Sequence, residues 1–434
     1  MDAGEPLTRA QRTMLAAAAF VVAVTRLFAL ARSPWDWDEM LFSLALRDFN
    51  VAAHHPHPPG FPGYVALAKV VRLFVDSDFH AIQGVNLLAA MLALPAMYLL
   101  ARSLRFDFST SLTAGVIFAF LPNVWLYGGT GLSDEPSVVV LLFAIAFLLR
   151  PKWYFLGCVL LGIALTFRPQ SALMAVYPWL AASWPRFRAR RLDPLLGALV
   201  VIGICAIAYG IAAYLTGWDQ YRMAVRLHGE YIASVDSFRN PARPPVLEVA
   251  RRYAIDPFFA RRRAIVLALF AIIGLLRFRR GTREAILIFG PFFVFACFMF
   301  DFIALSRYSI AYMPLTAVLA ADGIAVASFR RSVLQAAFAV AAIAPLVPMT
   351  WRAMAEVRTH DSPPAAAARW IRTHVDRRTA TIYIHDSVSP HAEYFLNDYR
   401  QVPVDDTFSP ARRRGGGWAR GRARSCRRSP AAAS

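Results

Sequence analysis

Charged residues are scarce in this sequence: they make up 17% of the 434 residues, while 57% are hydrophobic. The hydrophobic residues fall in long blocks, which excludes an ordinary soluble protein and predicts a membrane protein with several spans. Cysteine is also rare. Three of the four cysteines lie inside apolar segments, and their spacing matches neither a metal site nor a disulfide framework. The sequence also lacks a Gly-rich phosphate-binding loop and an internal repeat.

Positive charge, in contrast, is in excess, with a net charge of +19. The arginines cluster in short connections between apolar segments, which follows the positive-inside rule and argues against a nucleic-acid partner. A cytoplasmic N-terminus places the basic connections inside, so that loops 32–79 and 128–136, segment 216–262 and the C-terminus lie outside. The first apolar segment has no small-residue cleavage site, so we expect a retained signal anchor.

One group of arginines, at 251–252 and 261–263, also falls outside under this topology. Interfacial anchoring explains such a group, and binding to a phosphate or an anionic lipid is the alternative.

The apolar runs predict an all-α polytopic membrane protein of about 11 transmembrane helices. These are centred near 12–31, 80–101, 111–128, 136–150, 153–167, 171–184, 195–215, 263–278, 284–304, 309–328 and 332–349. Beyond Thr350 the pattern alternates between helix and strand, which predicts a small extracytoplasmic α/β appendage. We therefore expect a transmembrane domain over 1–349 and an appendage over 350–408, with a disordered Arg-rich tail over 409–434.

The tail differs abruptly from the rest of the chain. From Ala411 onward it has eight arginines, no acids and no periodicity. Such a change of composition is typical of a shifted reading frame, which would truncate the appendage.

The first expected outer loop, 32–79, is the stretch around which the chain is organised. It carries Asp38 and Glu39 beside two tryptophans, then an amphipathic helix over Met40–Asn50, then HPHPPGFPG, which cannot remain helical. Adjacent residues at a helix start diverge by roughly 100°, so one acid can face a reaction while the other binds a partner or caps the helix. Residues 60–75 suit an interfacial or re-entrant helix.

Further polar residues lie at the outer ends of later spans. Asp134 starts the fourth span, and its alternatives are helix capping and catalysis. Arg168 lies in the short connection between the fifth and sixth spans, and Arg307-Tyr308 lies at the start of the tenth. Each arginine either binds a lipid phosphate or snorkels to the interface. His54, His55 and His57 match no zinc pattern, which favours loop structure or sugar contact.

These motifs resemble those of the GT-C membrane glycosyltransferases. The closest likeness is to the protein O-mannosyltransferase-like and aminoarabinose-transferase-like group, glycosyltransferase family 39 and its bacterial relatives. DWDE, a helix and HPPGFP resemble that family's first outer loop. Asp134 resembles its second acidic position, Thr166–Pro169 occupies the place of its basic residue, and Arg307-Tyr308 with Pro314 resembles its RY…P motif.

The resemblance implies transfer of a hexosyl or pentosyl group from a polyprenyl-phosphate-linked donor to a lipid, glycan or protein acceptor. Transfer would take place on the extracytoplasmic face of the cell membrane. It would invert the anomeric centre, with Asp38 as general base. Glu39 and Asp134 are the other catalytic candidates, and His55, His57, Arg168, Arg307 and Tyr308 are the substrate-binding ones. No cofactor is certain, and a divalent metal remains open.

Two alternatives are a non-enzymatic polyprenyl-lipid transporter or flippase and an inactive lipid-binding relative. A transporter predicts charges deep in several spans and a repeated half-chain. Only Asp301 and Asp322 lie within expected spans, both near the ends.

Overall fold

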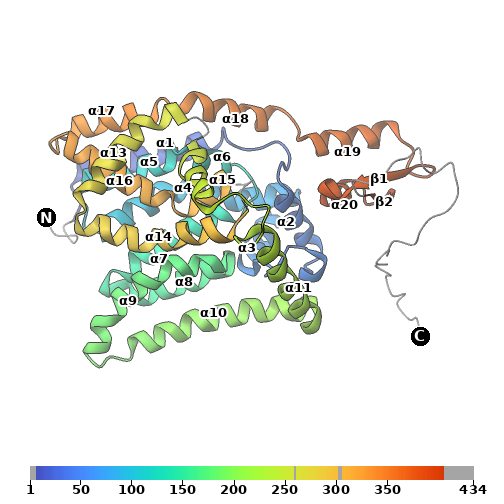
Figure 1. The fold of residues 1–434 in the computed structure, drawn as a ribbon, viewed down its shortest axis with the longest axis horizontal. Coiled ribbons are helices and arrows are strands. Elements are labelled where there is room, and N and C mark those ends of the chain that lie inside the picture. Colours follow the sequence, from blue (N-terminus) through green and yellow to red (C-terminus); the bar gives the residue numbers. More distant parts are fainter. Residues whose placement is uncertain (1–5, 259–260, 302–304, 405–434) are drawn as a thin grey trace.

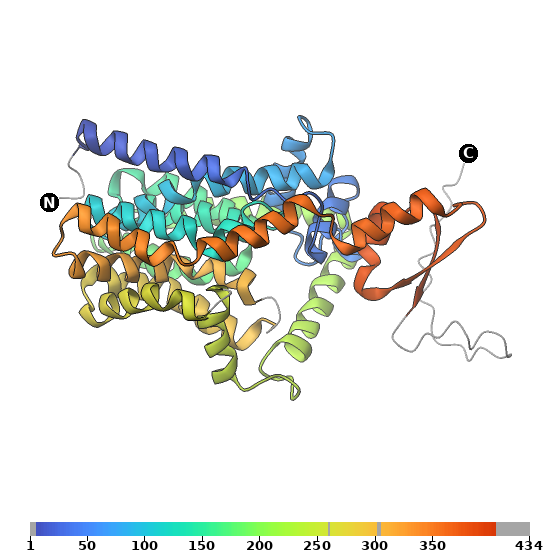
Figure 2. The same cartoon turned by 90° about the horizontal axis from the view of Figure 1, so that it is seen from above.

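The computed structural model describes residues 6–258, 261–301 and 305–404, which form a bundle of helices with a small appendage at one end (Figure 1). The start of α1 lies at the end of the bundle away from the appendage (Figures 1 and 2). The bundle helices are α1 (Arg9–Arg26), α4 (Asp78–Ser103), α5 (Phe108–Phe120), α7 (Asp134–Leu148), α8 (Tyr154–Phe167), α9 (Ala172–Arg188), α10 (Asp193–Thr216), α13 (Ile265–Arg277), α14 (Arg280–Met299), α16 (Met313–Ala327) and α17 (Ser332–Ile343).

Further helices connect or cap the bundle. They are α2 (Trp37–Arg47), α3 (Pro62–Arg72), α6 (Pro122–Tyr127), α11 (Trp218–Tyr231), α12 (Val246–Ile255), α15 (Leu305–Tyr308) and α18 (Val347–Thr359). Helix starts follow local chemistry. Ser77 and Asp107 cap α4 and α5 through their side chains, and proline stands in the first turn of α3 and α6.

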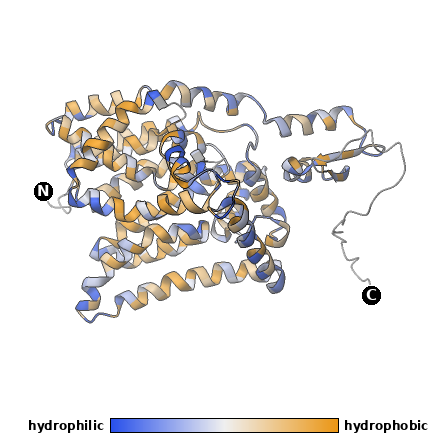
Figure 3. Ribbon diagram, viewed as in Figure 1, coloured by the Kyte–Doolittle hydropathy of each residue, from blue (hydrophilic) through white to orange (hydrophobic). Residues whose placement is uncertain are grey.

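The centre of the bundle is formed by α4 and α7, which pack against each other. In addition, α4 packs against α5, and α7 packs against α8. Most residues of α7 are buried, so its sequence is apolar all round. On the outside, α10 keeps apolar side chains such as Leu199, Ile202 and Ile207 more than half exposed. Figure 3 shows hydrophobic residues along the bundle helices, α10 included, and more polar residues in α11 and α18. An exposed apolar helix of this length suits contact with lipid.

Glycine permits the closest helix contact in the bundle, between α13 and α16. A Cβ atom on Gly274 would lie 2.0 Å from the carbonyl oxygen of Leu319, and one on Gly323 would lie 1.8 Å from that of Phe270. Larger residues at these two positions would force the helices apart.

Helices lie in all the ranges expected for spans, but their lengths differ from the expectation. Among the described residues, α4, α10 and α14 are long and apolar enough to cross a membrane. A fourth span results if α17 and the segment from Val347 count as one, bent by 53°. The number of spans therefore remains a prediction.

The end of the bundle differs from the sequence prediction. The expected span over 332–349 stops at Ile343, and α18 continues to Thr359, across the expected domain boundary at 349/350. Arg352, Glu356 and Arg358 interrupt the apolar residues of α18, so hydropathy did not reveal this helix.

The appendage contains α19 (Pro363–His374), β1 (Thr381–His385), α20 (Ser389–Phe395) and β2 (Arg400–Val404). The two strands pair in parallel, from Thr381↔Arg400 to His385↔Val404, with α20 between them in the chain. Residues 405–408 and the predicted tail 409–434 lie outside the described residues.

Candidate active site

A reciprocal cap fixes the start of α2. The side chain of Asp36 accepts a hydrogen bond from the backbone N–H of Asp38 (2.9 Å), and Glu39 accepts from those of Trp35 (2.6 Å) and Asp36 (2.8 Å). The other carboxylate oxygen of Glu39 accepts from the N–H of Gly131 (2.6 Å). Glu39 is 1% exposed and ties the first outer loop to the loop before α7.

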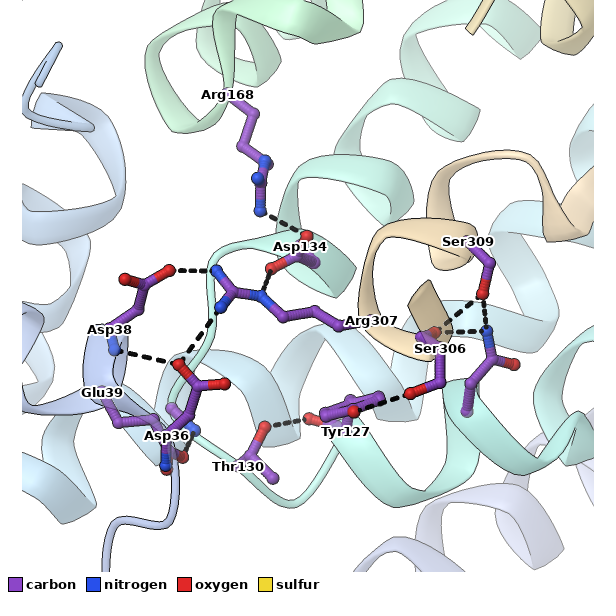
Figure 4. Close-up of polar contacts among 12 residues, drawn as sticks. Asp36, Asp38, Glu39, Tyr127, Thr130, Asp134, Arg168, Ser306, Arg307 and Ser309 are labelled. Carbon is purple, nitrogen blue, oxygen red and sulfur yellow. Dashed lines mark hydrogen bonds and ion pairs between the residues drawn. The ribbon is translucent and has the colours of Figure 1, made fainter. Parts of the chain in front are cut away.

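This position differs from the catalytic role that the sequence suggests for Glu39. Its carboxylate is occupied by three backbone N–H groups and does not line the cavity described below. Burial, followed by the charge of Asp36, raises the pKa of Glu39 to about 7. Asp38 and Glu39 point in different directions (Figure 4), as the helical rotation requires. We therefore assign Glu39 a positioning role.

The guanidinium group of Arg307 joins three aspartates from distant parts of the chain (Figure 4). It pairs with Asp36 (3.1 Å), Asp38 and Asp134 (2.9 Å), and its side chain is 5% exposed. The planar fork of an arginine offers five donors in fixed directions, so one guanidinium can serve several carboxylates at once. Arg307 is therefore the centre of the polar cluster.

Arg168 completes this cluster by pairing with the other oxygen of Asp134. The side chain of Arg168 is 11% exposed, so it does not snorkel to a surface. Asp134 lies in the first turn of α7, as the helix-start alternative predicts, but Ser133 makes no side-chain cap and Asp134 binds two arginines.

The surrounding groups shift the pKa values of Asp36 and Asp38 in different directions. Burial by itself would raise the pKa of Asp38, but Arg307, His57 and Arg168 together outweigh it and hold this pKa below its usual range. For Asp36, burial raises the pKa and Arg307 offsets only part of the shift. Asp38 is consequently the carboxylate most firmly kept in its charged form.

Several polar groups that the sequence did not indicate hold the segment around Arg307 in place. The amide of Asn123 donates to the backbone oxygen of Ser306 (3.1 Å) and to the hydroxyl of Ser309 (2.8 Å). The hydroxyls of Tyr127 and Ser306 lie 3.0 Å apart (Figure 4). These contacts fix the backbone on both sides of Arg307.

A cavity of about 670 Å³ opens beside this cluster. Carboxylates, arginines and aromatic rings line it together, including Asp36, Asp38, His54, His57, Arg168, His228, Tyr231, Asp236, Asp301, Arg307 and Tyr308. The rings of His228 and Tyr231 on α11 stack at 15°. The sequence analysis did not anticipate α11 in the site; a histidine and a tyrosine three residues apart on an amphipathic helix are its only signal.

The loop histidines separate in the structure. His57 lines the cavity, with its Nδ1 3.6 Å from an oxygen of Asp38. Burial lowers the pKa of His57 to about 4, against the opposing charge of Asp38, so its ring is neutral at pH 7. His54 lines the cavity as well. His55 does not: its Nε2 lies 3.2 Å from Glu393 of α20, so it contacts the appendage rather than the cavity.

The carboxylates of this site do not fit a divalent metal in the arrangement observed. Asp36, Asp38 and Asp134 converge on the guanidinium of Arg307, where a cation would have to displace a positive charge. Among the described residues, no group of three or more His, Cys, Asp or Glu side chains is arranged to hold an ion.

No protein-family model and no curated protein significantly matches the sequence. Solved structures do resemble it. ArnT from Cupriavidus metallidurans bound to undecaprenyl phosphate matches with a TM-score of 0.63 and 13% identity, over 93% of this chain and 87% of that one. The same protein in the apo state matches with a TM-score of 0.60 and 14% identity, over 91% and 86%.

An oligosaccharyltransferase from Archaeoglobus fulgidus, in complex with Zn and sulfate, is also similar, with a TM-score of 0.56 and 13% identity over 90% of this chain. The present chain spans 62% of the length of that protein. At these identities the likeness establishes the fold. The chain has the GT-C fold of membrane glycosyltransferases.

Proposed function

We propose that this protein is an integral membrane glycosyltransferase that transfers one sugar from a polyprenyl-phosphate-linked donor to an acceptor on the extracytoplasmic face. One observation carries the proposal: acids and arginines from four separate segments meet beside a single cavity within this fold. Perturbed titratable groups that converge on a cavity are typical of catalytic sites.

The donor's phosphate would lie against Arg168 and Arg307. Both side chains line the cavity, and a planar guanidinium binds phosphate oxygens through two parallel hydrogen bonds. Without donor, both arginines are neutralised by aspartates. The phosphate must therefore compete with these carboxylates for the two arginines. This competition favours a ligand whose strongly anionic group reaches the correct position.

This competition also activates Asp38. While Arg307 pairs with Asp38, the pKa of Asp38 stays low and the carboxylate is a weak base. Once the donor's phosphate draws Arg307 away, the buried Asp38 loses its main stabilising charge and its pKa rises. Asp38 then becomes a better general base at the moment the donor is in place.

The chemical step follows from these positions. Asp38 takes the proton of the acceptor hydroxyl as the acceptor oxygen bonds to the anomeric carbon from the face opposite the phosphate. The bond between the anomeric carbon and the phosphate oxygen breaks, and the polyprenyl phosphate leaves with its electron pair, stabilised by Arg168 and Arg307. Attack from the opposite face inverts the anomeric centre.

The proposal includes a topology in the plasma membrane. The N-terminus would lie in the cytoplasm, and α2, α3, α11 and the appendage over residues 360–404 would lie outside. Reporter fusions at Arg188 should then read cytoplasmic, and fusions at Ser234 and Thr381 extracytoplasmic. A cytoplasmic signal at Thr381 would contradict this topology.

The function itself is tested with purified protein and labelled polyprenyl-phosphate sugars in the presence of candidate acceptors. We expect release of polyprenyl phosphate together with a labelled product. Movement of intact donor across a vesicle membrane without its cleavage would support the transporter alternative instead.

A further inference from the structure

A second cavity, of about 430 Å³, lies at the seam between the first outer loop and the appendage, apart from the site described above. Residues of α2 and of the start of α4 line one side, and residues of α19 and α20 line the other. Four arginines line it, namely Arg32, Arg47, Arg369 and Arg372. Among the described residues that line it there is no aspartate or glutamate.

The carboxylates that balance these arginines lie behind them. Asp361 pairs with Arg32 (3.3 Å) and Arg369 (2.7 Å), and its side chain is 10% exposed. The side chains of these two arginines are 52% and 59% exposed. Arg32 also donates to the backbone oxygen of Thr359 (3.2 Å), whereas Arg369 can bind Asp361 with one nitrogen and keep its other donors accessible.

The same arrangement occurs twice more around the cavity. Asp78 pairs with Arg47 (2.6 Å) and Arg72 (2.8 Å). Asp398 pairs with Arg372 and Arg377, at 3.1 Å in each case. Six arginines thus share three aspartates, which leaves three surplus positive charges around the cavity.

The walls of the cavity are held in place by contacts that do not use its free guanidinium edges. The hydroxyl of Tyr394 donates to Asp78 (3.1 Å), and its ring packs 3.9 Å from the guanidinium carbon of Arg47. The backbone N–H of Ser362 donates to the hydroxyl of Ser33 (2.8 Å). The site is consequently preformed between two parts of the chain.

We propose that this seam binds a phosphate group. Several guanidinium groups around one cavity, each with its carboxylate partner turned away from it, match the charge and the bidentate geometry of phosphate. The group could belong to a membrane lipid or to a soluble phosphate. Leu73 and Phe74, which are 79% and 82% exposed, lie between Arg72 and Asp78 in the chain, where they can contact a membrane surface.

The test uses the full-length protein in detergent and a triple variant, R47Q/R369Q/R372Q. Each substitution removes a cavity arginine but leaves Asp78, Asp361 and Asp398 with one partner each, so no buried carboxylate is orphaned. The matched control is R72Q/R377Q, which removes a partner from two of the same aspartates without touching the cavity lining.

Binding of inorganic phosphate is measured from the rise in thermal stability relative to chloride at equal ionic strength. We expect wild type and control to bind alike, and the triple variant to bind about tenfold more weakly or worse. Equal binding by the triple variant would overturn the proposal, because phosphate held at Arg168 and Arg307 would survive these substitutions. If the triple variant does not fold, R369Q alone should still weaken binding.

A second arm separates the sources. Native mass spectrometry compares retention of phosphatidylglycerol with that of phosphatidylcholine. Phosphatidylglycerol retained by wild type and control, but not by the triple variant, identifies a lipid headgroup. Phosphate binding without such retention identifies a soluble phosphate, and the absence of both contradicts the site.

Discussion

The two arginine clusters of this protein have opposite balances. In the candidate active site, Arg168 and Arg307 serve three aspartates, and both arginine side chains are nearly buried. At the seam, six arginines share three aspartates, and the four that line the cavity are about half exposed.

The difference shows how one pair of residue types can serve two purposes. Where acids are in excess and buried, each arginine is already neutralised, and a phosphate must displace a carboxylate to bind. Displacement releases that carboxylate for another task, such as accepting a proton. Where arginines are in excess and accessible, a phosphate adds to the existing pairs and releases nothing. The first arrangement suits catalysis, and the second suits binding.

The largest effect is expected from removing the shared cation. Arg307→Ala leaves Asp36, Asp38 and Asp134 close together with Arg168 as the remaining cation. Removing one partner of a buried ion pair typically costs about 3–5 kcal/mol of stability. We expect a marked fall in thermal stability and no measurable sugar transfer. Arg307→Lys should restore folding better than transfer, because a compact ammonium replaces the charge but not the planar fork of donors. Wild-type stability of Arg307→Ala would show that the cluster contributes little to the fold.

Asp38→Asn should affect catalysis with little effect on the fold. Loss of a general base typically lowers the rate by about 10²–10⁴-fold. Donor binding, followed by native mass spectrometry, should persist. Asp36→Asn is the matched control. Asparagine also caps a helix, so this variant should keep the start of α2 and most of the activity. If Asp38→Asn retains more than about a tenth of the rate, a reduction too small for a lost base, Asp38 is not the base and Asp134 becomes the next candidate.

Arg168→Ala should mainly impair donor use. Asp134 keeps Arg307 as its partner, so the protein should fold. Loss of a charge-assisted contact to phosphate should raise the KM for the donor by about tenfold or more. Arg168→Lys should recover part of this loss, since a point charge replaces a planar fork. An unchanged KM in Arg168→Ala would show that the residue does not contact the donor.

Glu39→Gln should lower stability through the first loop. The side-chain NH₂ group of a glutamine would face backbone N–H groups that donate to Glu39 in the wild type. Leaving such buried donors without an acceptor typically costs about 1–3 kcal/mol. The pKa of Glu39 is raised from 4.5 to about 7, so the folded protein holds this proton more tightly than the unfolded chain. Its contribution to stability should therefore fall as pH rises through that range, and Glu39→Gln should remove this fall. Thermal unfolding of both proteins at several pH values tests this, and identical profiles would contradict the assignment.

The smallest effect is expected from a chelator. Because the three aspartates converge on Arg307, we expect sugar transfer to be the same with and without EDTA. Loss of transfer in EDTA that is restored by Mg²⁺ or Mn²⁺ would show that a metal replaces the guanidinium in the working enzyme.

The sequence identified the members of the polar cluster around Arg307 better than their connections. Asp38, Asp134, Arg168 and Arg307 each stand at a helix end beside apolar segments, where a charge signals function. Their mutual pairing joins residues up to 269 positions apart, so no local pattern encodes it. Arg168 consequently has an aspartate where the sequence suggested a lipid phosphate.

Residues that act through the backbone or through packing were harder to predict. Glu39 looks like a second catalytic acid until Gly131 is brought beside it by the fold. Asn123 and Tyr127 lie in a short apolar helix and gain their role only when Ser306 packs there. α18 was missed because its charged residues interrupt the apolar run that marks a span, and helical propensity is weaker evidence than hydropathy.

The most direct test of the account compares two pH profiles of the wild-type protein. The dependence of kcat/KM on pH reports the free enzyme, and that of the single-turnover rate at saturating donor and acceptor reports the complex. If the donor's phosphate draws Arg307 away from Asp38, the acid limb of the single-turnover profile lies at higher pH than that of kcat/KM. Acid limbs at the same pH in both profiles would show that donor binding leaves Asp38 unchanged and would contradict the proposed switch.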